Sequence, residues 1–97
     1  MARFDVHRGP DGELLLDCQA DVLRYFETRL VVPLLPARGT VQASRLHPVF
    51  TVDDAPVVMV TQLASAVPVK ALRSKVTSLS DEQPAIMNAL DMLLTGH

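Results

Sequence analysis

The stretch 46–63 reads LHPVFTVDDAPVVMVTQL, and it predicts an antiparallel hairpin. Two apolar runs rich in β-branched residues, Leu46–Val52 and Pro56–Leu63, flank Asp53 and Asp54, and such a pair of aspartates favours a tight turn. Because Pro48 lacks the N–H that a central ladder position needs, we expect the first run to be an edge strand or a strand with a break. The hairpin indicates a sheet of short strands.

Two segments nearer the N-terminus predict further strands. Residues Arg3–His7 alternate polar and apolar, the Gly-Pro-Asp-Gly turn at 9–12 follows, and Leu14–Leu16 then predicts the second strand of a hairpin. The run Leu30–Leu34 is also strand-like, and Pro33 predicts an edge position or a break for it.

The segment 64–79 mixes strand and helix formers around Pro68, so we predict irregular structure or a short strand there. Most of the seven prolines lie within or beside predicted strands. Short, bent strands of this kind suit a small barrel better than a sandwich.

A helix is predicted from Ser80 to the end of the sequence. Ser80 and Gln83 have capping-box spacing, and Pro84 suits a first turn. One arc of the helix is apolar and is predicted to face the core; it consists of Ile86, Met87, Ala89, Leu90, Leu93 and Leu94. The opposite face, with Asn88, Asp91, Met92 and Thr95, is predicted to be solvated. The sequence stops directly after this helix, which we interpret as presenting its last residues to a partner.

Composition predicts one globular domain spanning residues 1–97, because 48% of the chain is apolar and 21% is charged. The net charge of −2, with basic residues mostly scattered, argues against direct nucleic-acid binding. No run is long enough to span a bilayer and the N-terminus lacks a signal-peptide core, so we expect a cytoplasmic protein without membrane contact. Cys18 is the only cysteine, which excludes an internal disulfide and predicts a small buried side chain.

Four stretches, in order, resemble the CcdB family of toxins: Arg29–Leu34, Leu46–Val49, Met59–Val69 and Val76–Ser80. The resemblance implies an α+β, mainly β fold, in which an SH3-like small barrel of short antiparallel strands carries one C-terminal helix. It further implies a homodimer and the toxin component of a type II toxin–antitoxin module. Such a toxin binds and poisons the A subunit of DNA gyrase, is neutralised by a cognate antitoxin, needs no cofactor and has no enzymatic activity.

The resemblance also assigns a gyrase-binding surface by position. Its members lie in the loop after the second strand and at the end of the helix: Val22, Leu23, Asp91, Leu94, Thr95, Gly96 and His97. The gyrase poisons of the family end in Trp-Gly-Ile, whereas this sequence ends in Thr95-Gly96-His97. A buried aromatic anchor contributes about 2 to 4 kcal/mol to an interface. The alternative is therefore a relative that has lost gyrase poisoning and only binds antitoxin.

The antitoxin surface is assigned from the same resemblance. It comprises the first hairpin loop, one later segment and the edge of the helix: Arg8, Gly9, Pro10, Asp11, Gly12, Gln42, Arg45 and Asn88. A disordered acidic segment that folds on binding would cover it.

A ribonuclease toxin is a further alternative, from another class of function. His7, His47 and His97 would then combine with Asp5, Arg45 or Asp53 as acid and base. The histidines show no mutual spacing that builds such a site, and they lack the spacing of metal ligands, so we predict neither catalytic nor metal-binding residues.

Overall fold

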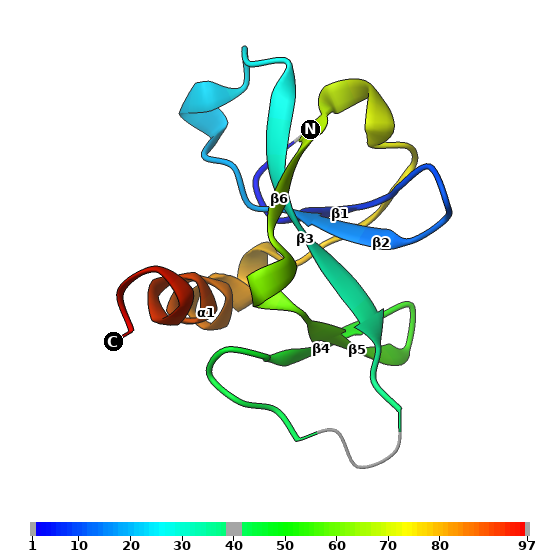
Figure 1. Ribbon diagram of the computed structural model, residues 1–97. Coiled ribbons are helices and arrows are strands. Elements are labelled where there is room, and N and C mark those ends of the chain that lie inside the picture. Colours follow the sequence, from blue (N-terminus) through cyan, green and yellow to red (C-terminus); the bar gives the residue numbers. More distant parts are fainter. Residues whose placement is uncertain (1, 39–41, 97) are drawn as a thin grey trace.

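The computed structural model describes residues 2–38 and 42–96, and in them the chain forms a curled half-barrel of antiparallel strands with one α-helix beside it (Figure 1). The strands are β1 (Asp5–Arg8), β2 (Leu14–Asp17), β3 (Thr28–Pro36), β4 (Val49–Val52), β5 (Ala55–Met59), β6 (Ser65–Pro68) and β7 (Lys75–Ser78). The α-helix is α1 (Gln83–Thr95). Four short 3-10 turns complete the elements: η1 (Asp21–Leu23), η2 (Thr61–Leu63), η3 (Val69–Ala71) and η4 (Ser80–Glu82). The predicted mainly β fold with a C-terminal helix is confirmed.

Strand β3 is central, so the edge position predicted from Pro33 is wrong. The strand order is β4-β5-β3-β2-β1-β7, and β6 also pairs with β3. Residues 28–31 of β3 pair with β6, whereas residues 34–36 pair with β5. Pro33 lies where β3 changes partner, and its carbonyl accepts the Val60 N–H at 3.1 Å on that side. N and O of one residue point to the same side of an antiparallel strand, so the missing N–H falls where no strand pairs with it.

Both predicted hairpins form, with shorter strands than the sequence indicated. Asp53 and Asp54 have φ values of 52° and 63°, as a two-residue turn with the twist of the strands requires. The turn at 9–12 joins β1 to β2, and Gly12 takes a φ of 80°. Pro48 precedes β4, and its carbonyl accepts the Met59 N–H.

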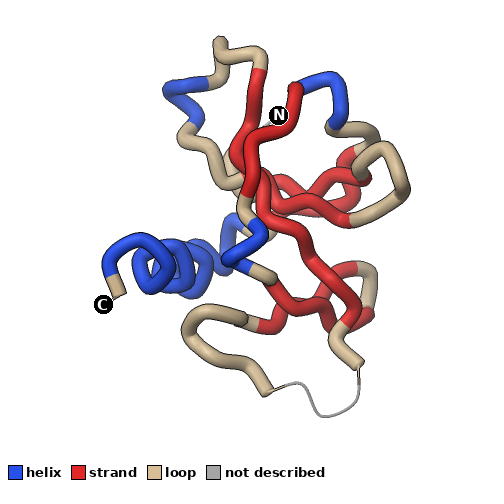
Figure 2. Tube along the Cα trace, in the orientation of Figure 1, coloured by secondary structure: helices blue, strands red, loops and turns tan. Residues whose placement is uncertain are grey.

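The segment 64–79 contains β6 and β7 with η3 between them, which confirms the short-strand prediction. β7 closes the sheet against β1, with Asp5 opposite Ser78. This pairing and the pairing of β6 with β3 curl the sheet (Figure 2).

Helix α1 begins at Gln83, and the predicted capping box is absent. Residues 80–82 form η4, so Ser80 lies within a 3-10 turn and its side chain caps nothing. Pro84 occupies the first helical turn, where its missing N–H costs little. At the other end Gly96 adopts a left-handed φ of 76° and donates its N–H to the Met92 carbonyl.

The main core lies between the sheet and α1. Ile86, Ala89 and Leu90 are buried in it, together with Val6, Leu16, Val32, Met59 and their neighbours. Leu93 and Leu94, predicted to face the core, are instead exposed, and Leu94 is 77% accessible. The last turn of α1 projects away from the sheet, which leaves these leucines uncovered (Figure 2). Among the residues described, no helix is long and apolar enough to cross a membrane.

Candidate target-binding surface

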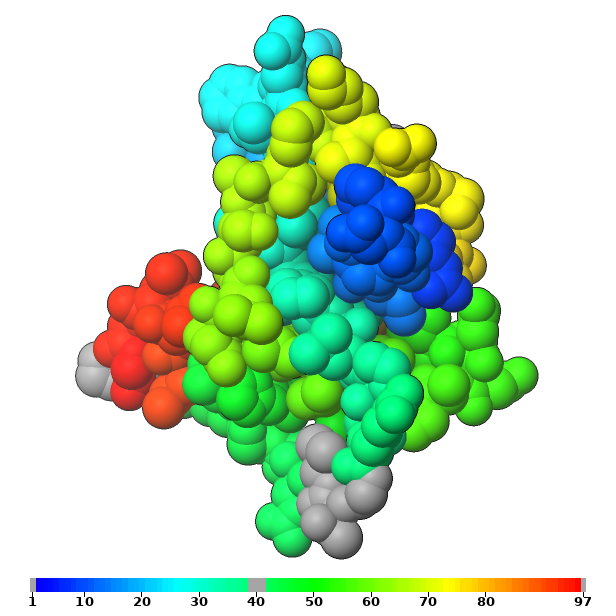
Figure 3. Space-filling model, turned by 45° about the vertical axis from the view of Figure 1, so that its right-hand side comes forward, coloured from blue at the N-terminus to red at the C-terminus, as the bar shows by residue number. Residues whose placement is uncertain are grey.

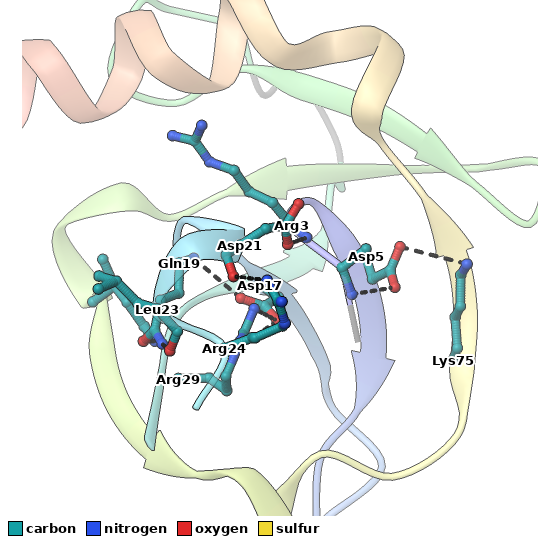
Figure 4. Close-up of polar contacts among 11 residues, drawn as sticks. Arg3, Asp5, Asp17, Gln19, Asp21, Leu23, Arg24, Arg29 and Lys75 are labelled. Carbon is teal, nitrogen blue, oxygen red and sulfur yellow. Dashed lines mark hydrogen bonds and ion pairs between the residues drawn. The ribbon is translucent and has the colours of Figure 1, made fainter. Parts of the chain in front are cut away.

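The segment between β2 and β3 is fixed at its base by a buried ion pair. Arg29 Nε donates to Asp17 Oδ2 at 2.9 Å, and Arg29 Nη2 lies 2.7 Å from the same oxygen. Asp17 and Arg29 are both inaccessible to solvent, and Figure 4 shows their contact inside the curve of the strands. The other carboxylate oxygen of Asp17 accepts the Gln19 N–H at 3.1 Å. A pair sealed in this way holds both ends of the segment in one position.

Further polar contacts hold the segment along its length. The Gln19 side chain accepts the Leu30 N–H at 3.2 Å and donates to the Leu23 carbonyl at 2.9 Å. Asp21 Oδ1 accepts the Arg3 N–H at 2.8 Å (Figure 4). These bonds tie η1 to β3 and to the N-terminal segment. The loop is therefore built to keep one shape.

This fixed loop, residues 20–27, presents apolar side chains to solvent. Val22 is 75% exposed and Leu23 is 41% exposed, which places both predicted loop residues on the surface. Tyr25 and Phe26, which our sequence reasoning missed, are 80% and 59% exposed. The signal was available, because the whole chain has only four aromatic residues and two of them are adjacent here. Clustered exposed apolar side chains mark an interaction surface.

The helix end is the second exposed apolar feature. Leu94 projects into solvent, and Asp91, Thr95 and Gly96 are also exposed. Thr95 Oγ1 donates to the Asp91 carbonyl at 2.7 Å, so the threonine hydroxyl is bonded to the backbone of its own helix. His97 lies outside the described residues.

The loop and the helix both lie at the left of the molecule in Figure 1, with η1 above α1, and they remain separate surfaces. Arg3 links the two, because its N–H bonds to Asp21 and its Nη2 lies 3.1 Å from Met87 Sδ on α1. The guanidinium group of Arg3 also stacks on the Phe4 ring at 4.7 Å. A partner that contacts both features must span this side of the molecule.

The residues assigned to antitoxin binding are not brought together. Arg8, Gly12 and Glu13 line a small groove of about 210 Å³ whose apolar walls come from Leu14, Leu34, Leu35, Pro36 and Val57. Arg8 Nη1 donates to the Gly12 carbonyl at 2.8 Å. Gln42 and Arg45 are exposed beyond β3, and Asn88 is exposed on α1, across the molecule from the β1–β2 hairpin in Figure 1.

The histidines do not assemble into a site in the part of the chain that is described. His7 is buried and donates through Nδ1 to the Arg73 carbonyl at 3.1 Å, whereas His47 bonds to Gln62 Oε1 at 2.6 Å. Each therefore serves a different part of the fold. Within residues 2–38 and 42–96, no three His, Cys, Asp or Glu side chains gather as metal ligands.

Cys18 follows β2 and is only 5% exposed, which confirms the buried side chain predicted from the sequence. Burial, and to a smaller extent the neighbouring Asp17 carboxylate, raise the pKa of the Cys18 thiol to about 12. The thiol therefore stays neutral at physiological pH and is unsuited to act as a nucleophile.

Comparison with solved structures shows that this small barrel-and-helix fold is shared with other proteins. The Mycobacterium tuberculosis toxin MazF-mt6 superimposes with a TM-score of 0.73 at 19% identity, covering 90% of this chain and 92% of that one. An endoribonuclease from mycobacterial species superimposes with a TM-score of 0.78 at 15% identity, covering 97% and 90%.

The chain itself belongs to the CcdB family, since the family model for the CcdB protein matches residues 3–96. Membership indicates the toxin of a toxin–antitoxin module. The prediction of a protein without enzymatic activity is corrected, because an endoribonuclease shares this fold over nearly the whole chain. A binding role inferred from the family therefore does not exclude catalysis on this scaffold.

Proposed function

We propose that this protein is a toxin that binds the A subunit of DNA gyrase through its 20–27 loop and the end of α1. The observation that carries the proposal is the exposure of Val22 and Leu94, at 75% and 77%, at two of the positions that the family resemblance assigns to gyrase binding. Both side chains stand on supported backbone, the loop through Gln19 and the helix through the Gly96 cap. A partner that covers such pre-organised apolar side chains loses little conformational entropy.

The free energy gained by burying these apolar side chains determines the expected affinity for gyrase. Full burial of one aliphatic side chain contributes about 1.5 to 3 kcal/mol. Val22, Leu23 and Leu94 together can therefore support an interface, whereas Thr95 supplies no aromatic anchor. We expect gyrase binding that is one to three decades weaker than that of a relative with the Trp-Gly-Ile end, at about 1.4 kcal/mol per decade.

A gyrase cleavage assay tests the proposal directly. Purified protein is added to gyrase and supercoiled DNA, and trapped cleavage complexes are released with detergent and counted as linear DNA. Wild type should increase linear DNA, and Val22→Asp and Leu94→Asp should each abolish the increase. The matched control is Leu35→Asp, because Leu35 is also exposed, at 43%, but lies at the far end of β3. Equal activity of all four proteins would refute the proposed surface.

We propose that the antitoxin binds another face of this protein and competes with gyrase from there. The groove between Arg8 and Val57 has apolar walls, and its lining includes both the Arg8 cation and the Glu13 carboxylate, so apolar contacts should dominate the binding of a peptide segment there. An acidic peptide from the gene next to this one should bind with a negative heat-capacity change and small salt dependence, measured by calorimetry. Leu34 in the groove wall is buried, so Leu34→Asp would disturb the fold. Leu35→Asp is therefore the variant to use, and it should weaken binding of the peptide without changing binding to gyrase.

An endoribonuclease toxin is the second candidate, and the shared fold at a TM-score of 0.78 is the observation that favours it. Incubation of the protein with a defined messenger RNA, followed by gel analysis, tests it. Discrete fragments that the antitoxin suppresses would support cleavage by this chain. Intact RNA together with gyrase-dependent DNA breaks would exclude RNA cleavage and support gyrase poisoning, the first candidate.

A further inference from the structure

The 20–27 loop carries a pair of aromatic side chains that lies outside the residues assigned by the family resemblance. Tyr25 is 80% exposed and Phe26 is 59% exposed, and they are two of only four aromatic residues in the chain. Figure 3 shows the loop, in cyan, at the top of the molecule beside the yellow-green segment after β6. Rings left in water forgo the stabilisation that burial gives them, so their adjacent placement on one loop indicates a contact surface.

The Tyr25 ring is held in place although it is exposed. Arg24 Cζ lies 4.8 Å from the centre of the Tyr25 ring, and Arg24 Nη2 donates to Tyr25 Oη at 3.1 Å. Arg24 Nη1 also donates to the Asp21 carbonyl at 3.3 Å, so the same side chain joins the ring to η1. A ring that is fixed before binding loses little conformational entropy when a partner covers it.

Phe26 lines a groove between the loop and the segment after β6. The groove measures about 570 Å³, and its lining comprises Arg24, Phe26, Glu27, Pro68, Val69 and Lys70. Val69 N–H donates to the Glu27 carbonyl at 2.8 Å, and Thr28 pairs with Pro68, so backbone pairing joins the two walls. A partner side chain that contacts Phe26 therefore enters a hollow of fixed shape.

The aromatic pair is continuous with the two loop residues, Val22 and Leu23, that form part of the proposed gyrase surface. Phe26 N–H donates to the Leu23 carbonyl at 3.1 Å, and Leu23 N–H donates to the Ala20 carbonyl at 2.9 Å. The aliphatic pair and the aromatic pair therefore stand on consecutive turns of one loop. A partner surface that buries Val22, which is 75% exposed, has to extend over the neighbouring turn to reach the size of a stable interface.

The area of the two rings matters for such an interface. A standard interface buries about 800 Å² on each partner. One buried aromatic side chain contributes about 150 to 250 Å², so at their exposed fractions Tyr25 and Phe26 together offer about 200 to 350 Å². Because the end of α1 carries Thr95 instead of an aromatic residue, the largest apolar side chains near the proposed surface are on the loop.

We propose that Tyr25 and Phe26 are the aromatic anchors of gyrase binding in this protein, in place of an aromatic residue at the end of α1. This role rests on the proposed gyrase function and specifies which residues dominate it. Arg24 is a positioning residue, because it holds the Tyr25 ring against η1. Buried aromatic side chains near the centre of an interface carry much of its affinity. The centre of the interface therefore lies on the loop, and the contact at Leu94 is secondary.

Calorimetric titration of the purified gyrase A subunit with this protein and its variants tests the proposal. Tyr25→Ala and Phe26→Ala should each weaken binding about tenfold or more, and each by more than Leu94→Ala does. Tyr25→Phe keeps the ring and loses only the bond from Arg24, so it should weaken binding a few-fold at most. Leu35→Ala, exposed at the far end of β3, is the matched control and should bind like wild type.

Arg24→Gln tests the positioning role separately. It should weaken binding several-fold in the wild-type background. In the Tyr25→Ala background it should have little further effect, because the ring that Arg24 positions is then absent. Equal losses in the two backgrounds would overturn the positioning role and show that Arg24 acts independently of the ring.

The same titrations distinguish failure of the anchors from failure of the gyrase function. No binding of wild type to the gyrase A subunit would refute the gyrase function, and the anchors with it. Wild-type binding that Val22→Asp abolishes, but that Tyr25→Ala and Phe26→Ala leave unchanged, would overturn the anchors alone. A change of oligomeric state or a loss of antitoxin binding in these variants, with gyrase binding unchanged, would also overturn them. Circular dichroism of each variant establishes that it is folded.

Discussion

Arg29 and Asp17 form a salt bridge of 2.7 Å in the curve of the sheet, with 1% and 0% of their side chains exposed. The two residues come from opposite ends of the segment that carries the candidate surface. A charge that loses its partner in such a place has neither water nor an opposite charge to stabilise it. The same contact therefore secures the fold and the position of the loop.

Replacing Arg29 by Met should lower the free energy of unfolding by about 3 to 5 kcal/mol, because the buried Asp17 carboxylate is left alone. Urea denaturation followed by circular dichroism measures this. The double variant Asp17→Asn with Arg29→Met should lose less than the sum of the single variants. Lys75→Gln is the control, since its ion pair with Asp5 is 3.5 Å long and Lys75 is 55% exposed; its loss should stay within about 1 kcal/mol.

Gln19→Leu should loosen the 20–27 loop without unfolding the protein. The variant loses the bonds to Leu30 N–H and the Leu23 carbonyl, each contributing about 1 kcal/mol. Trypsin cleavage after the exposed Arg24 should become several-fold faster, as followed by mass spectrometry. The control Gln42→Leu changes an exposed residue away from the loop. Cleavage at the wild-type rate would show that the Gln19 bonds do not hold the loop.

The thiol of Cys18 should remain unreactive in the native protein. Its pKa of about 12 lies above the ordinary thiol value of 9.0, so the native state binds the proton more tightly than the unfolded state does. This contribution to stability is complete below pH 9 and is lost as the pH rises from 9 toward 12. Labelling with a thiol-specific disulfide reagent at pH 8 should therefore require urea. Rapid labelling without urea would contradict the buried position, and Cys18→Ala should show a weaker loss of stability above pH 9.

We expect a homodimer, as the family implies. Met92 and Leu93 are each 39% exposed on the last turns of α1, and a second copy would cover such apolar surface. Light scattering coupled to gel filtration should give twice the chain mass of 10.6 kDa. Leu93→Glu should shift the equilibrium toward the monomer, whereas Leu35→Glu should not. A wild-type monomer at micromolar concentration would contradict this expectation.

Introducing an aromatic end should increase gyrase poisoning. In the double variant Thr95→Trp with His97→Ile, the Trp can project from the helix, although the bond from Thr95 to the Asp91 carbonyl is lost. The protein concentration that gives half-maximal linear DNA in the gyrase assay should fall by about one to three decades. Thr95→Val is the control, because it removes the same bond without adding an aromatic ring. No gain over wild type would show either that the native end already suits its target or that the target is not gyrase.

Local patterns predicted the hairpins and the helix well, because turn chemistry and apolar periodicity are properties of adjacent residues. Asp53 and Asp54 are an example. The edge position predicted from Pro33 was wrong, because the change of partner along β3 depends on β5 and β6, which lie later in the sequence. The prediction that Leu94 faces the core was wrong, because periodicity gives the direction of a side chain on the helix. It does not tell how far the sheet extends beneath that helix.

The candidate surface was only partly predictable. Val22 and Leu23 came from the family resemblance and are confirmed as exposed. The Asp17–Arg29 pair was missed, because it joins residues from two different strands.

The pairing of Asp5 with Ser78 has a consequence for synthesis. β1 emerges from the ribosome early, but its second neighbour is β7, which is translated much later. Contacts between distant parts of a chain require an entropy loss before they contribute any stability, so this sheet closes late and slowly. While residues 9–74 are being added, one edge of β1 has no partner strand. Such an edge pairs readily with other chains. The nascent toxin is therefore most prone to aggregation before residues 75–78 have been added.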